Sequence, residues 1–157
     1  MFKAFIDTNI LHDAFNVKRE FNEDATLLLF LAKTNEIDVC ICGSQITDFI
    51  YIASGGEKRS LIPSVQVWLQ DVLEFITVIP TGAEDLREVV HCDWMNLEDF
   101  LVYNSALKSN CDVLITRDKD DYTQSAIPYM DEHEFFDWYE KNYNIRYCFA
   151  ELATLPE

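Results

Sequence analysis

The chain has 157 residues, of which 49% are hydrophobic and 25% charged, and its formal net charge at pH 7 is −16. This length and apolar content predict one compact domain and exclude a disordered chain. No apolar run approaches the roughly 20 residues of a membrane span, and no signal peptide is visible, so we expect a cytoplasmic protein. The acidic balance disfavours non-specific nucleic-acid binding and suits a basic partner or a site for divalent cations.

The N-terminal half of the chain alternates between strand and helix patterns. An apolar run over residues 2–6 predicts a buried strand that ends abruptly at Asp7. Ser44 is the expected N-cap of a helix that a Gly-Gly pair ends. In chain order we expect, after the first strand, a short helix over 10–15, a helix over 23–34, a strand over 37–42 and a helix over 45–53.

The C-terminal half continues the alternation. Pro63 falls in the first turn of its helix, where proline is tolerated. Thr81 with Glu84, and Asp131 with Glu134, have the spacing of capping boxes. The expected elements are a helix over 60–73, a strand over 75–79, helices over 82–90 and 97–109, strands over 113–115 and 127–130, and a helix over 132–142.

Strands that are apolar on both faces and alternate with helices are typical of a parallel sheet covered by helices on both sides. The expected fold is therefore α/β, a three-layer α/β/α sandwich with a central parallel sheet of four to five strands. No linker or repeat divides the chain. We expect one domain over residues 1–143 and a C-terminal tail over residues 144–157 that is either packed on the domain or flexible.

The cysteines and histidines do not indicate a metal site. The five cysteines have no spacing typical of zinc ligands, so we expect buried thiols in a reducing compartment. Cys40 and Cys42 alternate along an expected strand, so both would face the same side of the sheet. His12, His91 and His133 lack a matching partner in the sequence, which favours packing or surface roles, although His12 is close enough to Asp7 to border a pocket.

Acidic residues follow the expected strands at the edge where a parallel α/β sheet binds its ligands. Several carboxylates in one pocket cannot all stay ionised without a compensating charge. The acids are Asp7 at the end of the first strand, Asp48 about one turn into the helix after the second, Glu98 and Asp99 at a helix start, and Asp118, Asp120 and Asp121 after the fourth strand.

Each acid also has a local explanation. Asp7 could simply cap a helix, and Asp99 could complete a capping box with Asn96. The acids from Asp118 onward could form an ordinary turn. Apolar residues around Asp48 predict a largely buried segment, in which an unpaired carboxylate is costly.

Divalent-cation chemistry fits a cluster of carboxylates best. Mg²⁺ and Mn²⁺ take oxygen ligands, and a pair of such ions can activate water and stabilise the leaving oxygen in phosphodiester cleavage. The chain has four glycines and lacks a Gly-rich phosphate loop, a G-x-S-x-G elbow and an H-E-x-x-H motif. A nucleotide cradle, a serine hydrolase and a zinc protease are therefore not indicated.

Four segments of the chain together resemble a PIN domain. The segments are Phe5-Ile6 followed by Asp7-Thr8-Asn9, the pair Thr47-Asp48, the helix start Leu97-Glu98-Asp99-Phe100 and the turn Ile115-Thr116-Arg117-Asp118. Their order and spacing are similar to bacterial VapC-type toxins of toxin–antitoxin pairs, from Phe2 to about Phe136. The resemblance implies a PIN-like nuclease domain that is an Mg²⁺- or Mn²⁺-dependent endoribonuclease. It also implies an RNA substrate, a cognate antitoxin as partner and a homodimer.

The resemblance also assigns roles by position. Thr8, Asn9 and Thr116 would orient the carboxylates. Asp48 stands where active toxins often carry Glu, and either acid of the last turn could face the metal. The implied catalytic residues are Asp7, Asp48, Asp99 and Asp118, and the implied metal ligands are Asp7, Asp99, Asp118 and Asp121.

Three pairs of basic residues fall in connections near the expected site. We hypothesise that they form a basic rim that contacts RNA on an otherwise acidic protein, with ordinary solvated surface as the alternative. The pairs are Lys18 with Arg19, Lys58 with Arg59, and Arg117 with Lys119.

Two other functions remain open at this point. One is a catalytically inactive PIN-like module that binds a protein partner or RNA without cutting. The other is a phosphohydrolase of the haloacid-dehalogenase type, which usually requires a second Asp two residues after the first, where this chain has Asn9.

Overall fold

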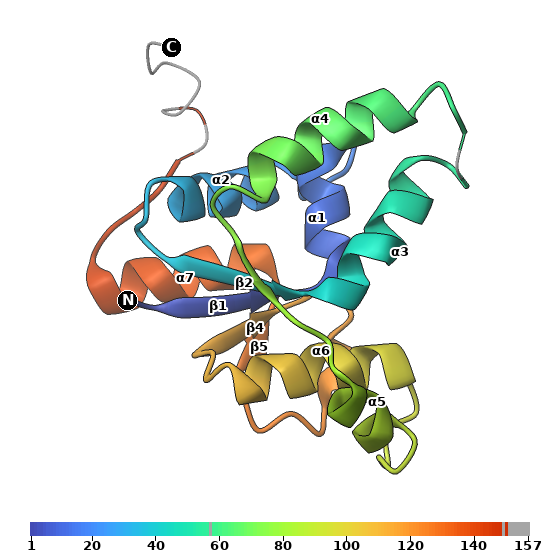
Figure 1. The fold of residues 1–157 in the computed structure, drawn as a ribbon. Helices are drawn as coiled ribbons and strands as arrows, with labels where there is room; N and C mark the ends of the chain where they lie inside the picture. Colours follow the sequence, from blue (N-terminus) through green and yellow to red (C-terminus); the bar gives the residue numbers. More distant parts are fainter. Residues whose placement is uncertain (57, 149, 151–157) are drawn as a thin grey trace.

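The fold is built on one sheet of five strands in the order β3-β2-β1-β4-β5 (Figure 1). The computed structural model describes residues 1–56, 58–148 and 150. All neighbouring strands are parallel, which confirms the predicted sheet. The strands are β1 (Lys3–Ile6), β2 (Asp38–Cys42), β3 (Thr77–Ile79), β4 (Val113–Ile115) and β5 (Tyr129–Met130).

Helices cover both faces of this sheet, as the three-layer prediction requires. The apolar sides of α1, α2, α4 and α7 share one core with the sheet, while α6 packs on the opposite face with α5 beside it (Figure 1). The helices are α1 (Thr8–Phe15), α2 (Asn22–Lys33), α3 (Gly43–Ala53), α4 (Ile62–Val72), α5 (Ala83–Val89), α6 (Leu97–Lys108) and α7 (Glu132–Tyr143), with a short 3₁₀ helix η1 (Lys119–Tyr122).

The alternation of side chains along each strand produces the two cores. Ala4 and Ile6 of β1 face the larger core, whereas Phe5 faces the smaller one. Cys40 and Cys42 are buried free thiols that lie in the same core as Phe5, which confirms that they share one side of the sheet.

His12 has the packing role predicted for it. The imidazole is buried and stacks on the Phe49 ring at 5.0 Å between centroids. This contact ties α1 to α3, the helix that follows β2. His12 therefore contributes to the core on the α1 face of the sheet.

Two predicted helix caps are wrong. Helix α3 begins at Gly43, so Ser44 lies inside it, and the Gln45 side chain accepts from the Cys42 backbone N–H at 2.8 Å. Helix α5 begins one residue later than predicted, because the Asp85 carboxylate accepts from the Gly82 N–H at 2.6 Å. In both places the side chain three residues after the N-cap residue accepts from the N–H of that residue.

The third cap is confirmed, and the remaining boundaries shift by a few residues. Asp131 accepts from the Glu134 N–H at 2.8 Å, and Glu134 accepts from the Asp131 N–H at 3.0 Å. The edge strands β3 and β5 are shorter than predicted, since each pairs with a neighbour on one side only.

Helix α7 ends at Tyr143, and the chain continues into the segment predicted as a tail. Asn144 ends the helix with a left-handed backbone (φ 54°), and Tyr147 then packs on Tyr139 at 5.7 Å between rings. The rest of the predicted tail, residue 149 and residues 151–157, lies outside the described residues. None of the helices within the described ranges is long and apolar enough to cross a membrane.

Candidate active site

Asp7 sits at the carboxyl end of the central strand β1, directly before α1. Its side chain is buried, with 6% of the residue exposed. One carboxylate oxygen, Oδ1, accepts from the Thr8 N–H at 2.6 Å, so Asp7 is also the N-cap of α1. The other oxygen, Oδ2, accepts from the Thr116 hydroxyl at 2.7 Å and from the Asn9 amide at 3.0 Å. The cap and the buried polar site are therefore the same residue.

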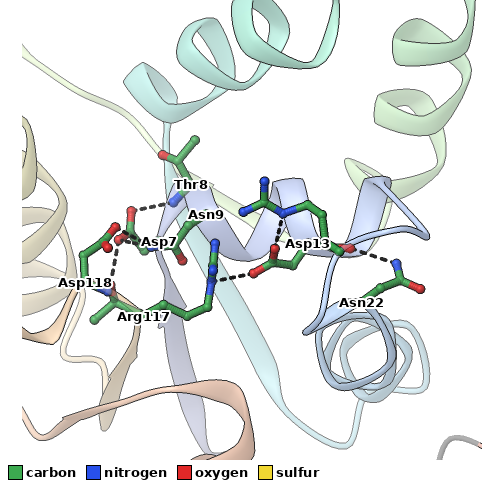
Figure 2. A network of polar contacts seen from close by, with 9 residues as sticks. Asp7, Thr8, Asn9, Asp13, Asn22, Arg117 and Asp118 are labelled. Carbon is green, nitrogen blue, oxygen red and sulfur yellow. Dashed lines mark hydrogen bonds and ion pairs between the residues drawn. The ribbon is translucent and has the colours of Figure 1, made fainter.

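The turn after β4 brings a second carboxylate to Asp7. The Asn9 amide nitrogen donates to Asp118 Oδ2 at 3.0 Å as well as to Asp7, so one side chain connects the two acids (Figure 2). The Thr116 hydroxyl accepts from the Asp118 N–H at 3.1 Å, which fixes the turn from inside. Residues 109 positions apart in the sequence meet here because β1 and β4 are parallel neighbours.

Asp99 enters the site from the first turn of α6. Asn96 caps this helix by accepting from the Glu98 and Asp99 N–H groups. The Asp99 side chain is not used for capping: its Oδ1 accepts from the Tyr122 hydroxyl at 3.3 Å, and its Oδ2 is buried without a partner among the described residues. Burial, with the nearby charges of Asp7 and Asp121, raises the pKa of Asp99 to about 7.

Asp48 lies next to Glu98 rather than beside Asp118. Burial raises the pKa of Glu98, and the charge of Asp48 and a hydrogen bond with it raise that pKa further. The prediction that the segment around Asp48 is largely buried is wrong: Phe49 is fully buried, but Tyr51 and Ile52 are 62% and 58% exposed. The end of α3 extends beyond the sheet (Figure 1), so only one side of this helix meets the core.

The two acids of the last turn face different neighbours. Asp118 is held against Asp7 by Asn9. Asp121, in η1, is exposed and acts on Asp99, since its charge is among the causes of the raised pKa there. The sequence alone left open which of the two acids belongs to the site, and both lie at its rim.

Positive charge offsets the acids of the site only in part: the Arg117 charge lowers the pKa of Asp7, but this guanidinium is already paired with the buried Asp13. Burial raises the pKa of Asp7, hydrogen bonds from Thr116 and Thr8 oppose this rise, and the Asp118 charge adds to it. Oxygen donors, an unpartnered buried Asp99 oxygen and raised carboxyl pKa values fit a hard divalent cation. Across residues 1–56, 58–148 and 150, however, no three Asp, Glu, His or Cys side chains are gathered as a ready-made metal cage. A bound ion would therefore need water molecules to complete its coordination.

The six basic residues of the hypothesised rim divide into two groups. Arg19 and Arg117 both pair with Asp13. Lys119 pairs with Asp131 at 3.1 Å and with Glu134 at 2.8 Å. Lys18, Lys58 and Arg59 are exposed and have no ion partner in the described part of the chain.

Sequence reasoning missed three residues close to this site. The fully buried Asp13 binds Arg117, the fully buried Glu132 lies beside Asp13, and Tyr122 donates to Asp99. Burial raises the pKa of Glu132 to about 8, and the Asp13 charge contributes. The only local signal was an acid within the apolar pattern of α1, because the other contacts are made between distant elements.

Comparison with known proteins identifies the family. The family model described as PIN domain matches residues 3–120, about three quarters of the chain. The chain belongs to the PIN-domain family. The matched segment runs from before Asp7, at the end of β1, to just after Asp118, and Asp121 lies one residue beyond it.

Known PIN-domain relatives are distant in sequence and similar in fold. Ribonuclease VapC1 of Aquifex aeolicus (strain VF5) is 23% identical over 126 residues, covering 77% of this chain and 85% of that protein. The structure of VapBC2 from Rickettsia felis, bound to a promoter DNA fragment, matches with a TM-score of 0.61 at 17% identity, over 82% of this chain and 98% of that one.

Two further solved structures share the fold. FitAcB from Neisseria gonorrhoeae matches with a TM-score of 0.60 at 12% identity, over 83% of this chain and 98% of that one. VapC20 of Mycobacterium tuberculosis, described as a sarcin-ricin loop cleaving toxin, matches with a TM-score of 0.53 at 13% identity, over 71% of this chain and 86% of that one. These likenesses establish the PIN fold for the present chain.

Proposed function

We propose that this PIN domain is a divalent-metal-dependent endoribonuclease that serves as the toxin of a toxin–antitoxin pair. The observation that supports this most is that Asn9 holds Asp118 beside Asp7 while the Asp7 charge acts on Asp99, and that burial raises the pKa of Asp7 and of Asp99. Such a group of acids needs a cation, and Mg²⁺ or Mn²⁺ suits its oxygen donors. The similarity to Ribonuclease VapC1 supports RNA as the substrate.

Each residue would have a distinct role in such a site. Asp7, Asp99 and Asp118 would hold the ion, with Asp121 at the Asp99 side. When bound, the ion supplies the positive charge that activates water and stabilises the leaving oxygen. Asn9 sets the spacing of Asp7 and Asp118 by donating to both.

Hydroxyl groups and a second acidic pair complete the arrangement. Thr116 holds Asp7 Oδ2, and Tyr122 holds Asp99 Oδ1, which leaves Asp99 Oδ2 buried and without a partner among the described residues. Asp48 with Glu98 forms a pair of acids that shares a hydrogen bond, and such a pair can take up a proton released by water.

The charge of the protein favours a basic antitoxin. A chain with net charge −16 attracts a cationic partner and repels RNA over most of its surface. The exposed Ile50, Tyr51 and Ile52 of α3 offer apolar contacts for that partner. The solved relatives VapBC2 and FitAB are complexes of this kind bound to DNA, which supports the proposal, and we further propose a cytoplasmic homodimer.

Titration with Mn²⁺ tests the metal site without relying on activity. Wild-type protein should bind Mn²⁺, and Asp99→Asn should weaken binding at least about tenfold because it removes the carboxylate with the unpartnered oxygen. Asp71→Asn, which breaks only an exposed pair with Lys33, is the matched control. Equal affinities for wild type and Asp99→Asn would contradict the proposal.

A module that binds without cutting is the second candidate. The observation in its favour is that no three ligand side chains are gathered closely in the described residues. Absence of Mn²⁺ binding together with retained antitoxin or RNA binding would establish this alternative.

A further inference from the structure

A second cluster of buried charges lies behind the site, and the proposed mechanism does not use it. The Asp13 carboxylate, in the second turn of α1, is fully buried and contacts two guanidinium groups. Arg117 Nε lies 2.7 Å from Asp13 Oδ2, and Arg19 Nε donates to Asp13 Oδ1. Figure 2 shows Arg117 reaching this carboxylate from the turn after β4.

Arg117 stands between the two residues of the turn that contact Asp7 and Asn9. Thr116 before it donates to Asp7, and Asp118 after it accepts from Asn9. The Arg117 side chain extends away from Asp118 toward α1, so the turn is held from two directions (Figure 2). A shift of the turn's backbone would disturb both the hydrogen bond from Thr116 to Asp7 and the one from Asn9 to Asp118.

The Asp13 end of the contact is itself firmly fixed. The Asn22 amide donates to the backbone carbonyl of Asp13 at 2.8 Å and to that of Ala14 at 3.2 Å, which ties the start of α2 to the end of α1. The Arg117 guanidinium lies over the Phe21 ring, with its Cζ atom 5.3 Å from the ring centroid. The Asp13 carboxylate therefore accepts a hydrogen bond from Arg19 and forms a close ion pair with Arg117.

Cost argues against a purely stabilising role. Removing charges from water is expensive, and an apolar pair of similar volume often stabilises a core as well or better. A buried pair is most useful where it fixes one geometry, and here it fixes the turn that carries Asp118. Glu132 of α7 lies beside Asp13 as a further buried acid of the same cluster, and the Asp13 and Arg117 charges act on it in opposite directions.

We propose that Asp13 is a positioning residue: through its ion pair with Arg117 it holds the turn at residues 116–118 so that Thr116 and Asp118 meet Asp7 and Asn9. This role rests on the proposed nuclease function for its effect on rate. The fixed geometry of the turn, however, is a property of the protein alone. Arg117 and Arg19 are then structural cations and not RNA contacts.

The test combines two measurements on Asp13→Asn. Hydrogen exchange should become at least about tenfold faster in residues 116–121. Helix α2 should stay protected, because Asn22 still donates to the backbone carbonyls of Asp13 and Ala14. Cleavage of an RNA oligonucleotide should lose about 10- to 100-fold in kcat with KM unchanged, as expected when residues that orient a site are disturbed. The conservative Asp13→Glu variant should recover part of both effects.

Two further variants make the outcome decisive. Asp85→Asn removes a mostly buried carboxylate of α5 that pairs with Lys108. Lys108 lies at the end of α6 remote from Asp99, so this control variant should lower stability without changing kcat. If Asp13→Asn does not fold, Arg117→Lys keeps a cation beside Asp13 and should still speed exchange in the turn.

The readouts also separate this proposal from the function it rests on. If wild-type protein cuts no RNA, the nuclease proposal fails while the exchange measurement still tests the anchor. Unchanged exchange in residues 116–121, or a full kcat in Asp13→Asn, would overturn the positioning role.

Discussion

Glu132 allows the energetics of the buried charges to be tested quantitatively. The residue is fully buried at the start of α7, and burial raises its pKa from the ordinary 4.5 to about 8. An acid whose pKa is raised on folding binds its proton more tightly in the folded state. The contribution of Glu132 to the free energy of unfolding is therefore greatest below pH 4.5 and is lost as the pH rises toward 8.

The size of the effect follows from the two pKa values. At about 1.4 kcal/mol for each tenfold change in proton affinity, the rise to about 8 corresponds to an order of 5 kcal/mol lost between the two pKa values. The Asp13 charge contributes to this value and Arg117 opposes it, so a measured loss of about 2 to 5 kcal/mol agrees with the structure. Glu132→Gln should remove this loss, because the amide resembles the protonated acid and does not ionise.

Urea unfolding of wild type and Glu132→Gln at pH 5 and pH 8 is the assay. The variant should match wild type at pH 5 to within about 1 kcal/mol and exceed it at pH 8 by about 2 kcal/mol or more. Glu140→Gln, at an exposed position of the same helix, should leave the pH dependence as it is. An equal difference between Glu132→Gln and wild type at both pH values would refute the reasoning.

Two further predictions concern the rim of the site. Joint replacement of Lys58 and Arg59 by Ala should weaken RNA binding and reduce the slope of log affinity against log salt by about 1 to 2, whereas Lys33→Ala, which loses a cation already paired with Asp71, should do neither. A filter-binding series from low to high salt distinguishes these results. Asp118→Asn should lower the cleavage rate by about 100-fold and Asp121→Asn by less than about tenfold, because Asn9 holds only Asp118 against Asp7. The opposite order in a single-turnover assay would assign the larger role to Asp121.

Local patterns in the sequence predicted much of the fold. The apolar run before Asp7 reads as a strand buried on both faces, and in the structure β1 is the middle strand of the sheet. Because parallel strands place their carboxyl ends at one edge, Asp7 and Asp118 could be expected to meet there, and they share the Asn9 amide. Cap identities were less predictable. Ser44 was the expected cap, but α3 begins at Gly43, and Gln45 accepts from the Cys42 N–H while it donates to the Ile6 carbonyl of β1.

The unpredicted features depend on contacts between distant segments. Asp13 and Glu132 come from the first and last helices, and the only local indication of a fully buried acid is the position of Asp13 within the apolar pattern of α1. The same applies to the basic rim: local sequence shows where Arg117 and Lys119 lie but not that acids on α1 and α7 pair with them. Exposure of Tyr51 and Ile52 follows from how far α3 extends past the sheet, which residue types do not specify.

Cleavage of RNA by Asp7→Asn tests the central claim most directly. The asparagine keeps the size of the side chain and an acceptor for the Thr8 N–H, so the fold and its circular dichroism should be retained. Loss of the charge should abolish Mg²⁺-dependent cleavage, with RNA ends mapped beside those of the wild type. Cleavage by Asp7→Asn at the wild-type rate would contradict the account.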